Sequence, residues 1–271
     1  GIDFGSTGVY YVSFLMQNNP GNANGYFFVQ LARASDSAIG LNMGMTGTRR
    51  ARVGYAYTGC AADGTVNLDT NGLYFMVAKI TTAAGTNMDT YAMNFYHQVS
   101  NTVTLAEPCT WTLNYRTNLA NIICDTIGVL GGDAGSGGVI FSNHLDEIRI
   151  GTTWADVTGN TGTPATITFN NLTQPYNGAA RTVTATTAPG GLSVTITYAG
   201  GAAPVSPGTY TVTGKVCDAT YAGTATGTLT VNKATPTISV LPTASGLTYG
   251  AARSASTRSG GTAPVPGSFA F

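Results

Sequence analysis

The chain has 271 residues, and only 24 of them are charged, 12 basic and 12 acidic. With two glutamates and no net charge, the composition excludes a coiled coil, a helical bundle and a charged disordered tail. The zero net charge also argues against nucleic-acid binding, which requires clustered cations. The 36 glycines and 44 threonines instead favour β-structure, because β-branched side chains fit a pleated surface.

The first 158 residues contain short runs of β-branched and aromatic residues, each bounded by Gly, Asn, Asp or Pro. Runs of this kind between turn-forming residues predict strands. No stretch shows a sustained helical period, so the strands are expected to pack as two antiparallel sheets, in a sandwich or a jelly roll. The predicted strands are 9–16, 25–33, 38–45, 51–57, 73–80, 90–97, 110–115, 121–129, 138–141 and 146–151.

Two of the four cysteines flank a predicted hairpin between strands 110–115 and 121–129. Antiparallel pairing about the turn near residues 116–118 would place Cys109 opposite Cys124. A disulfide there would stabilise the fold by about 3 kcal/mol in the chain-entropy model. The alternative is that both residues are buried thiols.

The segment FSNHLDEIRIGTTWADV, residues 141–157, resembles the closing strand of bacterial LamG-like domains. These are concanavalin A-like jelly rolls of secreted and surface proteins, and strands 9–15 and 73–80 fit the same pattern. The resemblance covers about residues 1–158. It implies a jelly roll that often holds calcium, although the sequence does not place the ligands. Such domains usually have one or two further strands before the one at Val9.

Residues 159–164 lack apolar side chains and are expected to form a linker. Beyond them, five short predicted strands indicate a small immunoglobulin-like sandwich in residues 165–233. These predicted strands are 165–169, 181–187, 192–198, 208–216 and 224–231. The motifs QPYNG (174–178), PGTYTV (207–212) and DATYAGTATGTLTV (218–231) resemble the bacterial MBG-type Ig-like repeat.

A second, incomplete copy of this repeat occupies residues 234–271, because the YNGAAR motif at Tyr176 recurs as YGAAR at Tyr249. Half of a sandwich cannot bury its own sheet face. One explanation is a fragment of a longer repeat protein. The other is strand complementation, in which the half-repeat donates strands to a neighbouring chain and links copies head to tail in an open filament. The candidate strands for this contact are Ser268, Phe269, Ala270 and Phe271.

No catalytic pattern accompanies the fold. Glycoside hydrolysis needs two carboxyl groups held on one face, whereas Glu107 and Glu147 are far apart in sequence and Asp146 and Glu147 are adjacent in a predicted strand. None of the four cysteines forms a CxxC pair and only two histidines occur, so no metal site is predicted. We therefore expect no enzymatic activity and no cofactor beyond the calcium that the resemblance implies.

A carbohydrate site is the alternative small-ligand expectation, because sugar sites combine an aromatic face with amide or carboxylate groups. Trp111 and Tyr115 share one face of predicted strand 110–115 and are the weak candidates. No apolar run approaches the length of a transmembrane helix, so no membrane insertion is expected. The sequence thus predicts an exported bacterial surface or extracellular protein with a structural or adhesive role, and a lectin-like module on an Ig-like stalk is the alternative.

Overall fold

The chain divides into two compact units, which we describe separately. Unit 1 comprises Gly1–Thr163 and Asp218–Ala222, and unit 2 comprises Pro164–Cys217 and Gly223–Phe271. The computed structural model describes residues 2–3, 5–17, 25–33, 36–46, 50–55, 61–69, 72–84, 89–97, 103–117, 123–124, 126–133, 144–234 and 237–262.

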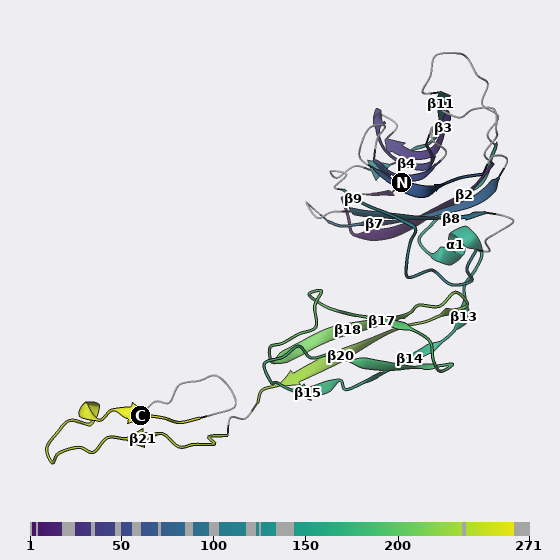
Figure 1. Ribbon diagram of the computed structural model, residues 1–271. Helices are drawn as coiled ribbons and strands as arrows, with labels where there is room; N and C mark the ends of the chain where they lie inside the picture. The colour runs from purple at the N-terminus through teal and green to yellow at the C-terminus, as the bar shows by residue number, and fades with distance from the viewer. Residues whose placement is uncertain are drawn as a thin grey trace. The chain divides into compact units, whose positions relative to one another are not determined.

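Unit 1 contains two five-stranded antiparallel sheets, drawn as two layers in Figure 1. The first sheet has the order β12 (His144–Gly151), β2 (Gly8–Gln17), β7 (Leu73–Thr82), β8 (Asp89–His97) and β9 (Leu113–Thr117). The second has the order β11 (Thr126–Asp133), β3 (Gly25–Arg33), β4 (Asp36–Met45), β5 (Arg50–Tyr55) and β6 (Ala61–Asn67). A small pair, β1 (Ile2–Asp3) and β10 (Ile123–Cys124), completes the unit.

The main core of unit 1 lies between these two sheets and follows strand alternation. Phe14 of β2 pairs with Met76 of β7, and both side chains are fully buried. From the other sheet, Val29 and Met43 form a second cross-strand pair that is also fully buried. Because alternate residues of a strand point to opposite faces, each sheet contributes one apolar face to this core.

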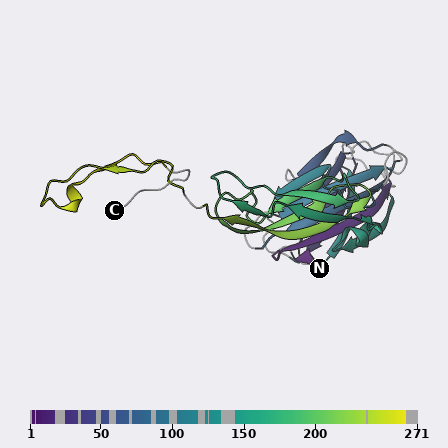
Figure 2. The same ribbon diagram turned by 90° about the horizontal axis from the view of Figure 1, so that it is seen from below.

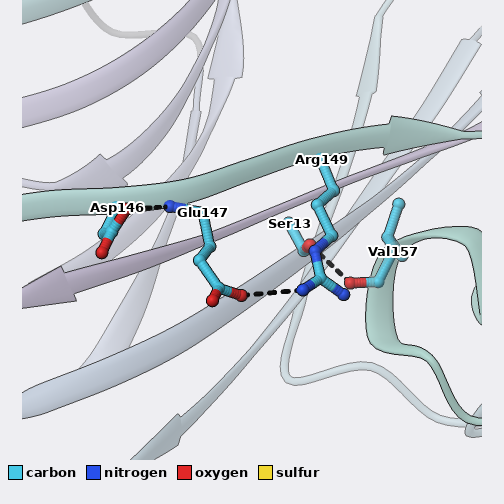
Figure 3. Close-up of polar contacts among 5 residues, drawn as sticks. All are labelled: Ser13, Asp146, Glu147, Arg149 and Val157. Atoms are coloured by element: carbon cyan, nitrogen blue, oxygen red, sulfur yellow. Dashed lines mark hydrogen bonds and ion pairs between the residues drawn. The ribbon is translucent and has the colours of Figure 1, made fainter.

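The outer face of the first sheet carries a second, smaller core beneath helix α1 (Trp154–Thr158). The helix begins with a capping box, in which the Thr153 hydroxyl accepts from the Asp156 N–H and the Asp156 carboxylate accepts from the Thr153 N–H. It ends at Gly159, whose left-handed conformation (φ 76°) suits a residue without a side chain. The Ser13 hydroxyl of β2 donates to the Val157 carbonyl at 2.8 Å and fixes the helix on the sheet (Figure 3).

Residues Asp218–Ala222 belong to unit 1 although they lie between two strands of the Ig-like repeat in sequence. The Ala106 N–H donates to the Ala219 carbonyl at 3.1 Å, and the Thr163 N–H donates to the Thr220 carbonyl at 2.7 Å. Part of the predicted linker 159–164 is therefore β13 (Thr163–Pro164), which pairs with β19 (Tyr221–Ala222).

Unit 2 contains one complete small sandwich, labelled around β18 in Figure 1. Its four-stranded sheet has the order β15 (Thr173–Pro175), β20 (Thr224–Asn232), β18 (Gly208–Val216) and β17 (Val194–Tyr198). The facing pair consists of β14 (Thr166–Asn170) and β16 (Thr184–Ala188). Only four apolar side chains form its buried core, namely Val183, Val212, Leu229 and Val231.

Two glycines of the larger sheet allow the two layers of this sandwich to approach each other. A Cβ atom at Gly214 or at Gly227 would lie 3.0 Å from the ring of Phe169, which belongs to β14. The two glycines therefore leave room for an aromatic ring, which is one reason for glycine inside a strand.

The partial repeat, residues 237–262, forms a long hairpin without a buried core, shown in yellow in Figure 2. It contains β21 (Thr243–Ala244), the 3-10 turn η1 (Arg253–Ala255), β22 (Arg258–Ser259) and an isolated bridge between Val240 and Thr262. Its large apolar side chains are all exposed, namely Ile238, Val240, Leu241, Leu247 and Tyr249. The predicted donated strand, Ser268, Phe269, Ala270 and Phe271, lies outside the described residues.

The all-β class predicted from the composition is confirmed. Most predicted strands recur with small shifts, and strands 25–33 and 208–216 recur with the same bounds as β3 and β18. Strand β6 and helix α1 were not predicted, and predicted strand 138–141 lies outside the described residues. In the part of the chain that the structure describes, no helix has the length and apolarity needed to cross a membrane.

Candidate functional site

The predicted hairpin around Cys109 and Cys124 is wrong, and so is the disulfide derived from it. Strand β9 pairs with β8, whereas β10 pairs with β1 and β11 pairs with β3 in the opposite sheet. Cys124 is a buried thiol in the main core, whereas Cys109 is exposed and disulfide-bonded. Cys217 is also disulfide-bonded. Because Cys124 is a thiol and Cys109 is disulfide-bonded, the two predicted partners are not joined to each other.

The two sugar-binding candidates are not brought together either. Strand β9 begins only at Leu113, because the Asn94 side chain accepts hydrogen bonds from the N–H and the hydroxyl of Thr112. The ring of Trp111 packs edge-on against Trp154 on the outer face, with ring centroids 6.0 Å apart. Tyr115 instead stacks on Tyr91 at the main core, with centroids 6.1 Å apart.

The outer face of the first sheet holds a polar cluster that the sequence analysis missed. The Lys79 ammonium lies 2.5 Å from a Glu107 carboxylate oxygen and 5.6 Å from the centre of the Tyr11 ring. Burial, and secondly the charge of Glu107, raise the pKa of the Tyr11 hydroxyl far above its ordinary value. The tyrosine is therefore neutral and the carboxylate is already paired, so this cluster fixes the loop around Glu107 rather than presenting a reactive base.

The adjacent acids of β12 lie at a β-bulge, and Figure 3 shows their side chains and polar contacts. The pairing with β2 shifts between Asp146 and Arg149, and Glu147 adopts a positive φ of 51°. Regular alternation, assumed in the sequence analysis for these two acids, therefore does not hold here. The Asp146 carboxylate accepts from the Glu147 N–H at 2.8 Å, and the Glu147 carboxylate pairs with Arg149 at 2.8 Å. This ion pair is about half exposed, and exposed pairs of this kind contribute little stability.

The calcium that the resemblance implies has no assigned position in the structure. The Asp69 carboxylate oxygen Oδ2 lies 3.8 Å from His97 Nε2. The backbone N–H of Asp69 donates to the Tyr74 hydroxyl at 2.6 Å. Within the described ranges, no three His, Cys, Asp or Glu side chains gather closely enough to hold a metal ion.

A cavity of about 410 Å³ opens between the two sheets of unit 1, at the edge formed by β11 and β12. This volume lies within the range of small-ligand pockets. None of its lining residues carries a charged side chain. They are Ile2, Tyr10, Leu31, Cys124, Thr126, Ile127, Ile150, Gly151 and Thr152.

Comparison with known proteins gives a family match and, among solved structures, a weak similarity. Residues 165–235 match the family model described as the MBG domain, in agreement with the resemblance drawn from the motifs. MBG domains are typically extracellular bacterial domains. No curated protein matches the chain. The crystal structure of Scytalido-glutamic peptidase with a peptide-based transition-state analogue shares 11% identity, over 54% of this chain and 76% of that one. Its TM-score of 0.33 supports no conclusion on fold or activity.

The arrangement of the MBG-matching segment explains why its motifs recur. The Arg181 side chain, at the end of the YNGAAR motif, donates to the Pro175 carbonyl, and the Tyr176 N–H donates to the Asn232 carbonyl at 2.8 Å. The Val183 N–H donates to the Tyr198 hydroxyl at 2.8 Å. These contacts join β15 to the rest of the sandwich, so the motif has a structural role in the complete copy.

Proposed function

We propose that the protein is a non-enzymatic structural or adhesive component of the bacterial surface or extracellular matrix, whose copies associate head to tail. The observation that supports it is the partial repeat beside a complete MBG-type sandwich. Its five large apolar side chains are 45–105% exposed, whereas four buried apolar side chains form the core cluster of the complete copy. Exposed apolar residues on a hairpin with open edges favour association with another surface.

The composition supports the same role. Only 24 of 271 residues are charged, so few charges protect strand edges against pairing with other strands. Within described residues 237–262, no counterpart of β18 and β20 covers these apolar side chains. An added partner would remove these side chains from water, which is the main driving force of association.

The absence of enzymatic activity remains part of the proposal. Both glutamates are paired with a cation, Glu107 with Lys79 and Glu147 with Arg149. Each glutamate is thus engaged by a cation, whereas glycoside hydrolysis requires two carboxyl groups held on one face. The residues predicted for the lectin alternative, Trp111 and Tyr115, pack on opposite faces of the first sheet and do not form a shared site.

Sedimentation velocity of the purified full chain tests this function. We expect the mean sedimentation coefficient to rise with concentration between about 1 and 100 μM, the range of moderate protein affinities. Electron microscopy of the concentrated sample should then show linear assemblies, because head-to-tail contacts do not close on themselves. A single monomeric species at every concentration would contradict the proposal.

A further inference from the structure

The inner face of unit 1 is left uncovered at strand β11. Ile127 and Val129 pair directly with Leu31 and Val29 of β3. Directly opposed residues of an antiparallel pair lie on the same face, and Leu31 and Val29 belong to the main core. Ile127 and Val129 therefore face the core side, yet they are 47% and 52% exposed. Residues in this position are normally covered by the opposite sheet.

Strand β12, the edge of the opposite sheet, shows the same feature. Ile150 pairs with Val12, which is fully buried in the core, but Ile150 itself is 42% exposed. The uncharged cavity of about 410 Å³ contacts both edge strands, through Ile127 of β11 and Ile150 of β12. In the described part of the chain, β11 pairs only with β3 and β12 only with β2. Among the described residues, the sandwich is thus open along this edge. We call the cavity, together with the exposed side chains of Ile127, Val129 and Ile150, the β11 edge groove.

The side-chain spacing and the open strand edge of this groove suit an added β-strand better than a compact small molecule. The exposed side chains are spaced two residues apart along β11, as the side chains of an incoming strand would be. An edge strand also offers backbone N–H and C=O groups, which a strand can pair and an apolar small molecule cannot. The groove therefore fits an uncharged extended segment with β-branched residues at alternate positions.

The partial repeat contains a segment with these properties. In residues 237–241, sequence TISVL, Ile238 and Val240 alternate with polar residues and are 48% and 56% exposed. No residue of this segment is charged, which matches the uncharged lining of the groove. The segment is held to the rest of the hairpin through Thr262, which bridges Val240 and accepts from the Ser239 N–H at 2.8 Å.

In the complete repeat, the segment equivalent to residues 237–241 is strand β14, whose apolar side chains are covered by the sandwich. Ile238 and Val240 follow Ile167 and Phe169 by 71 residues each. Ile167 and Phe169 lie in β14, which pairs with β16, and the Phe169 ring packs on the core of the sandwich. The equivalent side chains in the partial repeat lack this cover among the described residues.

We propose that residues 237–241 of one copy add as a strand to the β11 edge groove of a second copy. Ile238 and Val240 then lie beside Ile127 and Val129 and close the open side of the sandwich. This inference rests on the proposed head-to-tail association and names the surfaces that form it.

Cysteine trapping between two different single variants tests the contact. Val129→Cys protein is mixed with Ile238→Cys or Val240→Cys protein and oxidised. Opposed residues of paired strands bring their Cβ atoms close to disulfide distance, so one of the two mixtures should give a covalent dimer joining the engineered positions. Mixing single variants detects contacts between chains only. The wild-type chain and a mixture with Val205→Cys, an exposed valine outside the groove, provide the controls for random oxidation.

A charge substitution gives a second, independent readout. Val129→Lys places a charge on the groove and should weaken association at least about tenfold in sedimentation experiments, whereas Val205→Lys should leave association unchanged. Circular dichroism and thermal melting of both variants verify that they are folded. A chain that associates but shows neither cross-link nor sensitivity to Val129→Lys overturns this inference and leaves the proposed function standing. A chain that remains monomeric overturns both.

Discussion

The Leu229→Ala substitution tests the account of the complete Ig-like sandwich. Leu229 is fully buried, and it is one of four side chains that form this core. Replacing a buried leucine with alanine costs about 3 kcal/mol, within a range of about 2–5. At roughly 0.05–0.15 kcal/mol per residue, a module the length of residues 165–235 has a stability of about 4–10 kcal/mol. One substitution therefore removes about a third or more of the free energy of unfolding.

Differential scanning calorimetry of the full chain measures this loss. In a domain of this size, 1 kcal/mol corresponds to about 4–8 °C, so the transition of the sandwich should move down by roughly 12–24 °C. Hydrogen exchange in β18 and β20 assigns that transition. The matched control is Val205→Ala, at a side chain that is 43% exposed, for which we expect a change within about 0.5 kcal/mol. Equal shifts for the two variants would refute the assignment of Leu229 to a core that holds the module together.

Three further predictions concern unit 1. Burial, and then the Asp89 carboxylate, raise the pKa of the Tyr91 hydroxyl above its ordinary value, so the folded state holds this proton more tightly than the unfolded state. Urea unfolding should therefore show constant stability up to about pH 10 and a decline above it that Tyr91→Phe reduces; an unchanged decline would contradict this cause. Thr153→Ala should cost about 1 kcal/mol, whereas Thr153→Ser should retain the cap, and equal stability of the two variants would be the opposing result. Peptide mapping without reduction should find Cys109 in a disulfide and Cys124 as a thiol that is alkylated only after unfolding. Recovery of a disulfide-linked Cys109–Cys124 peptide would show that these two cysteines are bonded to each other after all.

The strands of the fold could be predicted from the sequence because each is a local pattern. The run GYFFVQLAR, bounded by polar residues and glycine, contains enough aromatic and β-branched residues to identify β3 at its observed bounds. Strand β6 has the sequence AADGTVN, which has no aromatic residue, only two β-branched residues and no alternation, so the local pattern gave little signal for it. Helix α1 has only five residues, too few for a helical period, although Thr153, Asp156 and Gly159 form the cap pattern of a short helix.

Strand pairing could not be predicted in the same way, because it depends on contacts between distant residues. Two neighbouring strands such as β9 and β10 suggest a hairpin, but each pairs with a strand from elsewhere in the chain. The disulfide prediction relied on that local pairing and was wrong for this reason. The Trp111–Tyr115 prediction relied instead on alternation along one strand, and β9 begins only at Leu113. The internal repeat could be identified, since it depends on sequence similarity alone, and the MBG match confirms its complete copy.

The candidate sites depend on the same long-range contacts. The Lys79–Glu107 pair joins residues 28 positions apart, and the β11 edge groove combines residues from β1, β2, β3, β10, β11 and β12. No spacing in the sequence indicates either arrangement. The exposed apolar residues of the partial repeat were foreseeable, because half of a sandwich cannot cover its own face.

Head-to-tail association is the central claim, and sedimentation velocity of the unmodified full chain across a concentration series tests it most directly. The account predicts that the monomer peak gives way to a growing series of faster species as concentration rises, and that Val129→Lys restores the monomer. A monomer of constant sedimentation coefficient over the whole series would contradict the account.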